Sequence, residues 1–315
     1  MLHKNYDKET VHVVMEKLDS LVHQVHVDKS RKGIALYVSP WFQKVYFLDF
    51  EPTEKLILDD SFEIRDLIFN HAITNKIILL LLSGNELKYL VYKDRKFEKI
   101  HVDVPLRIEA FMNETLHDVA IYYEKSQRKD KARHVFAANA EQGLKSALKQ
   151  FPLPVIVAGT EKLISEFKSI TSHDKDIIDY VSGNYLESSE DELRHLVQDA
   201  LGRYKTKVEA ETIAKIKKID NPKIIAIGLK EVWKEASLKN VQTLIVEQNF
   251  RKPAALNPGK SEIFTYAMDK VPYPMQDAVD DIIEKVAESG GKIQFVSDDL
   301  LTDFRRIVLI KNHPS

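Results

Sequence analysis

The sequence predicts a three-domain α/β protein: a small N-terminal unit at residues 1–73, a larger domain at 74–204 and an α/β sandwich at 205–315. Short apolar runs with strand character alternate with segments of helical spacing, which is the pattern of mixed α/β sheets. A chain of 315 residues is long for one hydrophobic core and comfortable for two or three.

Composition narrows the functional classes. Hydrophobic residues make up 44% and charged residues 30% of the chain, as in ordinary globular proteins. A net charge of −2 argues against wholesale binding of polyanions, so DNA is not an expected partner, although basic residues can still cluster locally. The absence of cysteine excludes disulfides, thiolate zinc sites and cysteine-ligated clusters. The polar start and a longest apolar run of six residues, 77–82, against the ~20 that span a bilayer, predict a cytoplasmic protein with no membrane partner.

The N-terminal domain combines two helical patterns with a strand pair. The predicted elements are a helix at 9–25, strands at Gly33–Val38 and 44–50, and a helix at 59–70. Ser39-Pro40 predicts a hairpin-like turn between the strands. Asp60 or Ser61 is the expected N-cap of the second helix.

The central domain opens with a predicted hairpin across Gly84-Asn85. Its expected elements are strands at 76–83, 86–92 and 96–102, a helix from Arg133 to Pro152, a strand at 155–158, a helix at 161–168, an extended segment at 177–180 and a helix at 189–204. Ser189 with Glu192 three residues later predicts a capping box on the last helix. Residues 103–133 have no clean period and are expected to be irregular.

The C-terminal domain is expected to contain helices at 208–218, Leu229–Ser237 and 277–289, and strands at 224–227, 243–248, Lys292–Val296 and Ile307–Ile310. Residues 250–275 carry four prolines and predict an insertion or long loop. Gly290 predicts the C-terminal end of the third helix.

Three stretches together resemble the central and C-terminal domains of archaeal and eukaryotic class-I release factors and of Pelota. They are RHVFAANAEQGLKSALKQFPLPVIVAGTEKLISEF at 133–167, VSGNYLESSEDELRHLVQDAL at 181–201, and the pair LKEVWKEASLKNVQTLIVEQ and VDDIIEKVAESGGKIQFVSDD at 229–248 and 279–299. The N-terminal runs GIALYVSPWFQKVYFLDF and DDSFEIRDLIF resemble instead the bacterial archaeo-eukaryotic release factor-like families. The resemblance implies a release-factor-like architecture, a bacterial source and a role in translation.

The motif that carries peptidyl-tRNA hydrolysis in release factors is missing. No Gly-Gly-Gln occurs in the chain, and the corresponding stretch, about 104–133, contains no glycine to supply the backbone freedom of that loop. Gln127, the only glutamine there, lies between Ser126 and Arg128 and does not match the motif. Gly290-Gly291 is followed by Lys292. No catalytic residue, cofactor or metal site is therefore expected.

A basic run is the candidate RNA contact. It consists of Lys125, Arg128, Lys129, Lys131 and Arg133, with Asp130 as the single acid among them, and is interpreted as a loop. Such a loop binds tRNA or ribosomal RNA phosphates with an affinity that falls as salt rises. The alternative is a solvated charged loop, which most charge runs are.

The other candidate clusters are better explained by structural roles than by functional sites. His173, Asp174 and Asp176 favour a polar loop over metal ligands, and His23 with His26 marks a helix end. Trp41 and Phe42 are expected at an exposed hairpin tip, and Trp233 in a core. Five further lysines favour a solvated helix face over an RNA contact: Lys205, Lys207, Lys215, Lys217 and Lys218.

These observations favour a non-catalytic factor that enters the ribosomal A site, in hibernation, rescue or quality control, with rRNA or tRNA and a translational GTPase as partners. A second hypothesis is a peptidyl-tRNA or RNA hydrolase with a substituted loop, in which Glu124 or Gln127 orients water. A third is a stress-linked protein-interaction module.

Overall fold

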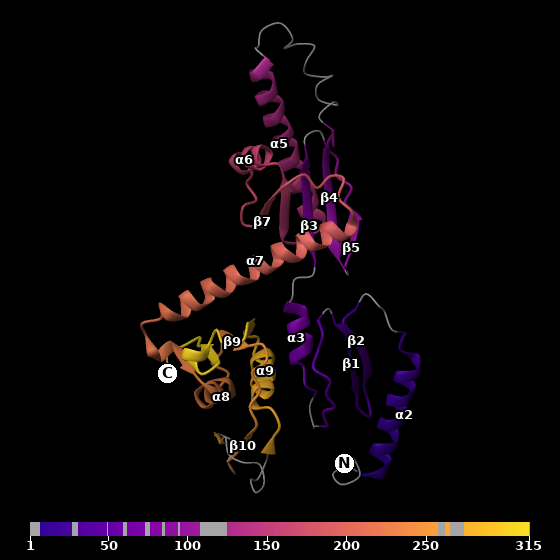
Figure 1. Ribbon diagram of the computed structural model, residues 1–315. Helices are drawn as coiled ribbons and strands as arrows, with labels where there is room; N and C mark the ends of the chain where they lie inside the picture. Colours follow the sequence, from indigo (N-terminus) through magenta and orange to yellow (C-terminus); the bar gives the residue numbers. More distant parts are fainter. Residues whose placement is uncertain are drawn as a thin grey trace. The chain divides into compact units, whose positions relative to one another are not determined.

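The computed structural model describes residues 7–26, 31–48, 50–58, 62–72, 76–83, 86–93, 95–107, 125–257, 262–264 and 274–314, without the side chains of 70–72, 125–130 and 274 (Figure 1). The chain forms two compact units. One is Thr74–Val208, and the other combines Met1–Ile73 with Glu209–Ser315.

The first unit is built on a mixed five-stranded sheet in the order β5-β4-β3-β6-β7. Its strands are β3 (Ile77–Ser83), β4 (Glu86–Lys93), β5 (Lys96–Lys99), β6 (Val155–Gly159) and β7 (Ile177–Ser182). The hairpin β3–β4 and the pair β4–β5 are antiparallel, whereas β3, β6 and β7 run parallel. The helices between the parallel strands allow this crossover topology.

Both faces of this sheet are covered by helices, which explains the continuous apolar run in β3. Ile78, Leu80 and Leu82 pack with α5 (Lys125–Gln150) and α6 (Glu161–Ile170) in one core. Ile77, Leu79 and Leu81 pack on the opposite face with the first half of α7 (Glu190–Lys217). The unit is therefore a three-layer α/β/α sandwich.

The second unit contains a four-stranded sheet in the order β13-β9-β14-β8. The strands are β8 (Ile225–Ile227), β9 (Thr243–Glu247), β13 (Lys292–Val296) and β14 (Ile307–Ile310). Helices α8 (Leu229–Ser237) and α9 (Ala278–Glu288) pack on one face with buried Trp233. Ile213 and Ile216 of α7 cover the other face. The predicted α/β class is confirmed.

The N-terminal segment packs on this C-terminal sandwich. It consists of α2 (Lys8–Gln24), the antiparallel hairpin β1 (Gly33–Val38) and β2 (Gln43–Leu48), and α3 (Arg65–Ala72). Ile68 of α3 joins the C-terminal core, and the Phe69 ring meets Phe295 of β13 edge to face at 5.3 Å. Helix α3 thereby lies against α9 and β13.

Several predicted bounds need correction. The helices expected on either side of Lys205 are one continuous helix, α7. Helix α3 begins at Arg65 rather than near residue 59, and the expected caps Asp60 and Ser61 lie outside the described residues. Strand β5 ends at Lys99 instead of residue 102.

The segment 250–275 contributes a small sheet instead of being a plain loop. Its described strands are β10 (Ala254–Leu256), β11 (Ile263–Phe264) and β12 (Pro274–Met275), with β10 central. Ala254 and Ile263 are buried against the C-terminal core. None of the helices in the described ranges is both long and apolar enough to cross a membrane.

Candidate functional site

The basic run lies at the start of α5, so its interpretation as a loop is wrong. The backbone is helical from Lys125, eight residues before the predicted start. Lys, Arg and Gln are good helix formers and need no apolar period to continue a helix. The side chains of Lys125, Arg128 and Lys129 lie outside the described ones, while Lys131 is exposed and Arg133 is half-buried.

The start of α5 extends past the ends of the strands of the five-stranded sheet (Figure 1). The first side chain of α5 in the hydrophobic core is Phe136, followed by Ala137, Ala140 and Leu144. Before it, His134 is exposed and its Nδ1 lies 2.8 Å from Oε1 of Glu166 on α6. The basic positions therefore occupy a helical projection, and their role in RNA binding remains a prediction.

A polar cluster in the same unit joins the segment between α6 and β7 to the middle of α5. Glu141 Oε1 accepts hydrogen bonds from the backbone N–H and the hydroxyl of Ser172 at 2.9 and 2.7 Å, and Oε2 accepts one from the Thr171 hydroxyl at 2.7 Å. Burial alone would raise the pKa of Glu141, but these hydrogen bonds outweigh it and hold the pKa below its ordinary value.

His173 belongs to the edge of this cluster. Its Nδ1 lies 3.2 Å from Asp176 Oδ2, and its Nε2 is 3.8 Å from Glu141 Oε1. The Ser172 hydroxyl donates to Glu141 rather than to His173, so the group is not arranged as a nucleophile with its base. Within the described part of the chain, no three His, Asp or Glu side chains are grouped to hold a metal ion.

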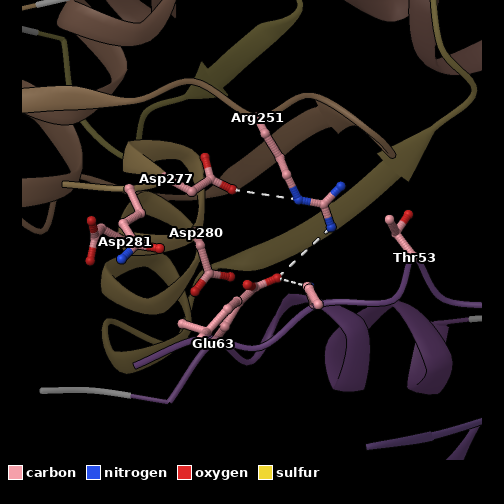
Figure 2. Close-up of a pocket in the computed structure, with 9 residues that line it drawn as sticks. Thr53, Glu63, Arg251, Asp277, Asp280 and Asp281 are labelled. Atoms are coloured by element: carbon pink, nitrogen blue, oxygen red, sulfur yellow. Dashed lines mark hydrogen bonds and ion pairs between the residues drawn. The ribbon is translucent and has the colours of Figure 1, made fainter. Parts of the chain in front are cut away.

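The second unit contains a cavity of about 260 Å³ between the N-terminal segment and the C-terminal sandwich. Figure 2 shows charged side chains converging on it from both parts. The charged lining residues are Lys55, Glu63, Arg251, Asp277, Asp280 and Asp281.

Arg65 lies beside this cavity as a fully buried cation. Its Nη1 donates to the Phe250 carbonyl at 2.8 Å, and its Nη2 forms an ion pair with Asp277 Oδ2 at 2.8 Å. Its backbone N–H donates to Asp280 Oδ1 at 3.2 Å. Three contacts on one residue thus join the start of α3 to the loop after β9 and to the start of α9.

The other cations of the cluster are shared among carboxylates. Lys55 contacts Glu63 and lies 2.9 Å from Asp66 Oδ2. The guanidinium nitrogens of Arg251 lie farther from their partners, at 3.9–4.0 Å from carboxylate oxygens of Glu63, Asp66 and Asp277.

Asp280 is the carboxylate with the most perturbed environment. Burial raises its pKa to about 7, and the negative charge of Glu63 adds to this, while Arg65 opposes it. Asp277, by contrast, is the N-cap of α9. Its Oδ1 accepts hydrogen bonds from the backbone N–H groups of Val279 and Lys252, both at 3.1 Å.

Sequence reasoning missed this cluster. A signal was present, because Arg65 interrupts an otherwise helical apolar pattern and Asp280 falls three positions after the cap residue Asp277, between Val279 and Ile282 on the buried face of α9. A charge on a buried helix face needs a partner. The partners lie 185 to 215 positions away and are not readable from local spacing.

The remaining predicted features are placed as follows. Trp41 is 91% exposed at the hairpin tip and Trp233 is buried, as predicted. His23 and His26 are exposed, and the Nδ1 of each lies near a backbone carbonyl. The five lysines of the predicted helix face, 205, 207, 215, 217 and 218, are exposed.

A known family matches most of the first unit, all of α7, and β8 and α8 of the second unit. The model of Bacterial archaeo-eukaryotic release factor family 3 matches residues 78–240, more than half of the chain. The chain belongs to this family. The family resemblance predicted from the sequence is confirmed.

Similar solved structures come from archaea and yeast. A ribosome-bound archaeal Pelota, described with ABCE1, has 14% identity and a TM-score of 0.44 over 75% of this chain and 61% of that chain. Saccharomyces cerevisiae Dom34, described as a translation termination-like factor that interacts with Hbs1, has 13% identity and a TM-score of 0.42 over 78% and 66%. The archaeal translation termination factor aRF1 has 15% identity and a TM-score of 0.26 over 97% and 82%.

The chain thus spans 61% and 66% of the lengths of the Pelota and Dom34 chains that it matches. No curated protein matches it.

Proposed function

We propose that this protein is a ribosome-associated translation factor that enters the A site and does not hydrolyse peptidyl-tRNA. The observation that carries the proposal is membership of a release factor family across residues 78–240 in a chain without Gly-Gly-Gln. Its role would be in hibernation, rescue or quality control, with ribosomal RNA or tRNA as the partner and a translational GTPase as a further one.

The start of α5 is the proposed RNA contact. It carries four basic positions within seven residues, Lys125 to Lys131, and Arg133 follows. It also lies before Phe136, the first residue of the helix that belongs to the hydrophobic core. A local cluster of cations attracts phosphate even when the net charge of the chain is −2.

Co-sedimentation with purified 70S ribosomes across a salt series tests the proposal. We expect binding at low salt that weakens steeply as salt rises, because phosphate contacts release counterions. Absence of binding at low salt to ribosomes of confirmed activity would overturn it and leave a protein-interaction module as the better explanation.

The variant Lys125→Ala/Arg128→Ala/Lys129→Ala locates the contact. Losing three phosphate contacts should lower the slope of log K against log salt by roughly two to three. The matched control is Lys145→Ala/Lys149→Ala/Lys162→Ala, which removes the same charge from exposed positions of α5 and α6 in the same unit. Equal losses in both triple variants would argue for a general charge effect.

A hydrolysis assay on ribosome-bound peptidyl-tRNA tests the absence of chemistry. We expect release no faster than without the protein, at concentrations where co-sedimentation is saturated. Release that is lost in Gln127→Ala while binding persists would instead establish the hydrolase with a substituted loop.

A further inference from the structure

We propose that the cluster of Glu63, Arg65, Asp277 and Asp280 is a releasable latch that holds the N-terminal segment on the C-terminal sandwich, and that ionisation of Asp280 loosens it. The inference concerns the second unit and is independent of the proposed ribosomal role. Opening the latch would uncover the surface of α9 and β13 against which α3 packs.

The attachment of the N-terminal segment suits a releasable contact. Its hairpin β1–β2 is a separate two-stranded sheet and is not hydrogen-bonded to the four-stranded sheet of the sandwich. The apolar part of the contact includes Ile68 and the ring pair Phe69–Phe295. Polar contacts between the two parts are carried by Arg65 and Arg251 and meet at the cavity of Figure 2.

The charges around Asp280 are unbalanced when every carboxylate is ionised. The groups facing it are Glu63, Arg65, Asp66 and Tyr37 of the N-terminal segment, Lys55 of the same segment, and Arg251, Asp277 and Asp281 of the sandwich. Among the described residues whose ion pairs are known, four carboxylates (Glu63, Asp66, Asp277 and Asp280) thus accompany three cations (Lys55, Arg65 and Arg251). Figure 2 shows Glu63 and Asp280 directed toward each other across the boundary, so ionisation of Asp280 places two like charges on the two parts that the latch joins.

The direction of the pH effect follows from linkage. Closure raises the pKa of Asp280 from its ordinary 3.8 to about 7, so between these values the closed form binds a proton that the open form has lost. Closure therefore weakens as pH rises through this window and changes no further above about 7, where both forms are ionised. Each pH unit inside the window corresponds to a tenfold change in the closure equilibrium.

The absence of native cysteine makes thiol labelling a direct test. The variant Ile68→Cys places the single thiol at the contact of α3 with the sandwich, and Ala236→Cys places one on the buried face of α8 in the same core. The measured quantity is the protection factor, the labelling rate in denaturant divided by the native rate at the same pH, because this ratio cancels the titration of the thiol itself.

We expect the protection of the thiol in Ile68→Cys to fall about tenfold per pH unit from pH 5 to near 7 and then to level. When Asp280→Asn is added, the amide oxygen can still accept from the Arg65 N–H, and protection should stay constant from pH 5 to 8.5. Adding Glu63→Gln instead should move the levelling point to lower pH.

Three results would overturn the proposal. One is an equal pH slope in the double variant Ile68→Cys/Asp280→Asn. Another is no slope in Ile68→Cys with Asp280 present. The third is labelling of Ala236→Cys in step with Ile68→Cys, which would mean that the whole sandwich unfolds instead of the latch opening.

Discussion

Glu141 stabilises the fold in its ionised form, because three hydrogen-bond donors from Thr171 and Ser172 point at its carboxylate oxygens. Glu141→Gln keeps the shape but puts an amide where donors converge, so we expect a loss of about 1 kcal/mol in the free energy of unfolding at pH 7. The pKa of Glu141 is lowered on folding from 4.5, so its contribution is complete above about 4.5 and disappears as pH falls through the lower, folded pKa.

Urea unfolding of both proteins between pH 7 and pH 3 checks this prediction. The difference between them should shrink on acidification below about pH 4.5, and the exposed Glu98→Gln should give no comparable difference at pH 7. A gap between Glu141→Gln and the unchanged protein that stays constant down to pH 3 would contradict the assigned role.

Residue-scale features were predictable where the signal is local. The capping box is present, with the Ser189 N–H donating to Glu192 Oε2 at 2.8 Å and the Glu192 N–H to the Ser189 hydroxyl at 3.3 Å. Trp233 is buried as its helical spacing indicates. Arg65 and Asp280 were not predictable in the same way, because what makes each tolerable in a buried place is a partner distant in sequence.

At the scale of elements, two helical glycines provide a matched pair. A Cβ at Gly143 of α5 would collide with the buried ring of Tyr89, meeting its Cζ at 2.6 Å and its hydroxyl oxygen closer still. That hydroxyl donates to the Ala140 carbonyl at 2.9 Å, so it cannot move without losing a buried hydrogen bond. Gly202 of α7 has nothing within 4 Å of the same position.

We therefore expect opposite effects from the same substitution. Gly143→Ala should destabilise by about 1–3 kcal/mol through overpacking, whereas Gly202→Ala should stabilise by about 0.5–1 kcal/mol by lowering the backbone entropy of the unfolded chain. Chemical denaturation followed by far-UV circular dichroism measures both. A neutral Gly143→Ala would mean that α5 is packed less closely on β4 than described.

The bounds of some helices and strands could be predicted from the sequence, and those of others could not. The bounds of β1, α8, β13 and β14 match the predicted ones. Gly33 opens β1, and Gly228 and Gly291 immediately precede α8 and β13, so turn chemistry and apolar spacing agree at these starts.

The prediction fails for α7, which was divided near Lys205. Residues 202–207 are largely exposed, so no apolar period marks them. The helix continues through them, with the Arg203 guanidinium donating to Asp179 Oδ2 of β7 at 3.0 and 2.7 Å, a contact that local spacing does not reveal.

At the scale of the whole molecule, the sequence predicts that residues 1–73 form a separate domain, and that division stays a prediction. In the structure these residues form one compact unit with Glu209–Ser315. Hydrophobic periodicity reveals that one face of α3 is buried but not what buries it. The contact of Phe69 with Phe295 is therefore a property of the folded chain that local patterns do not contain.

Removal of residues 1–73 tests how far the C-terminal sandwich depends on this packing. The chain has two tryptophans, Trp41 in the N-terminal segment and Trp233 in the core of the sandwich. With Trp41→Phe in the full chain, Trp233 is the single tryptophan in both proteins, and its fluorescence reports unfolding of the sandwich. Losing the burial contributed by Ile68 and Phe69 should lower the temperature of this transition by about 5–15 °C.

The first unit, followed by far-UV circular dichroism, should melt at an unchanged temperature, because its cores consist of residues from 77 to 201. An unchanged Trp233 transition would instead establish residues 1–73 as an independent domain that merely rests on the sandwich.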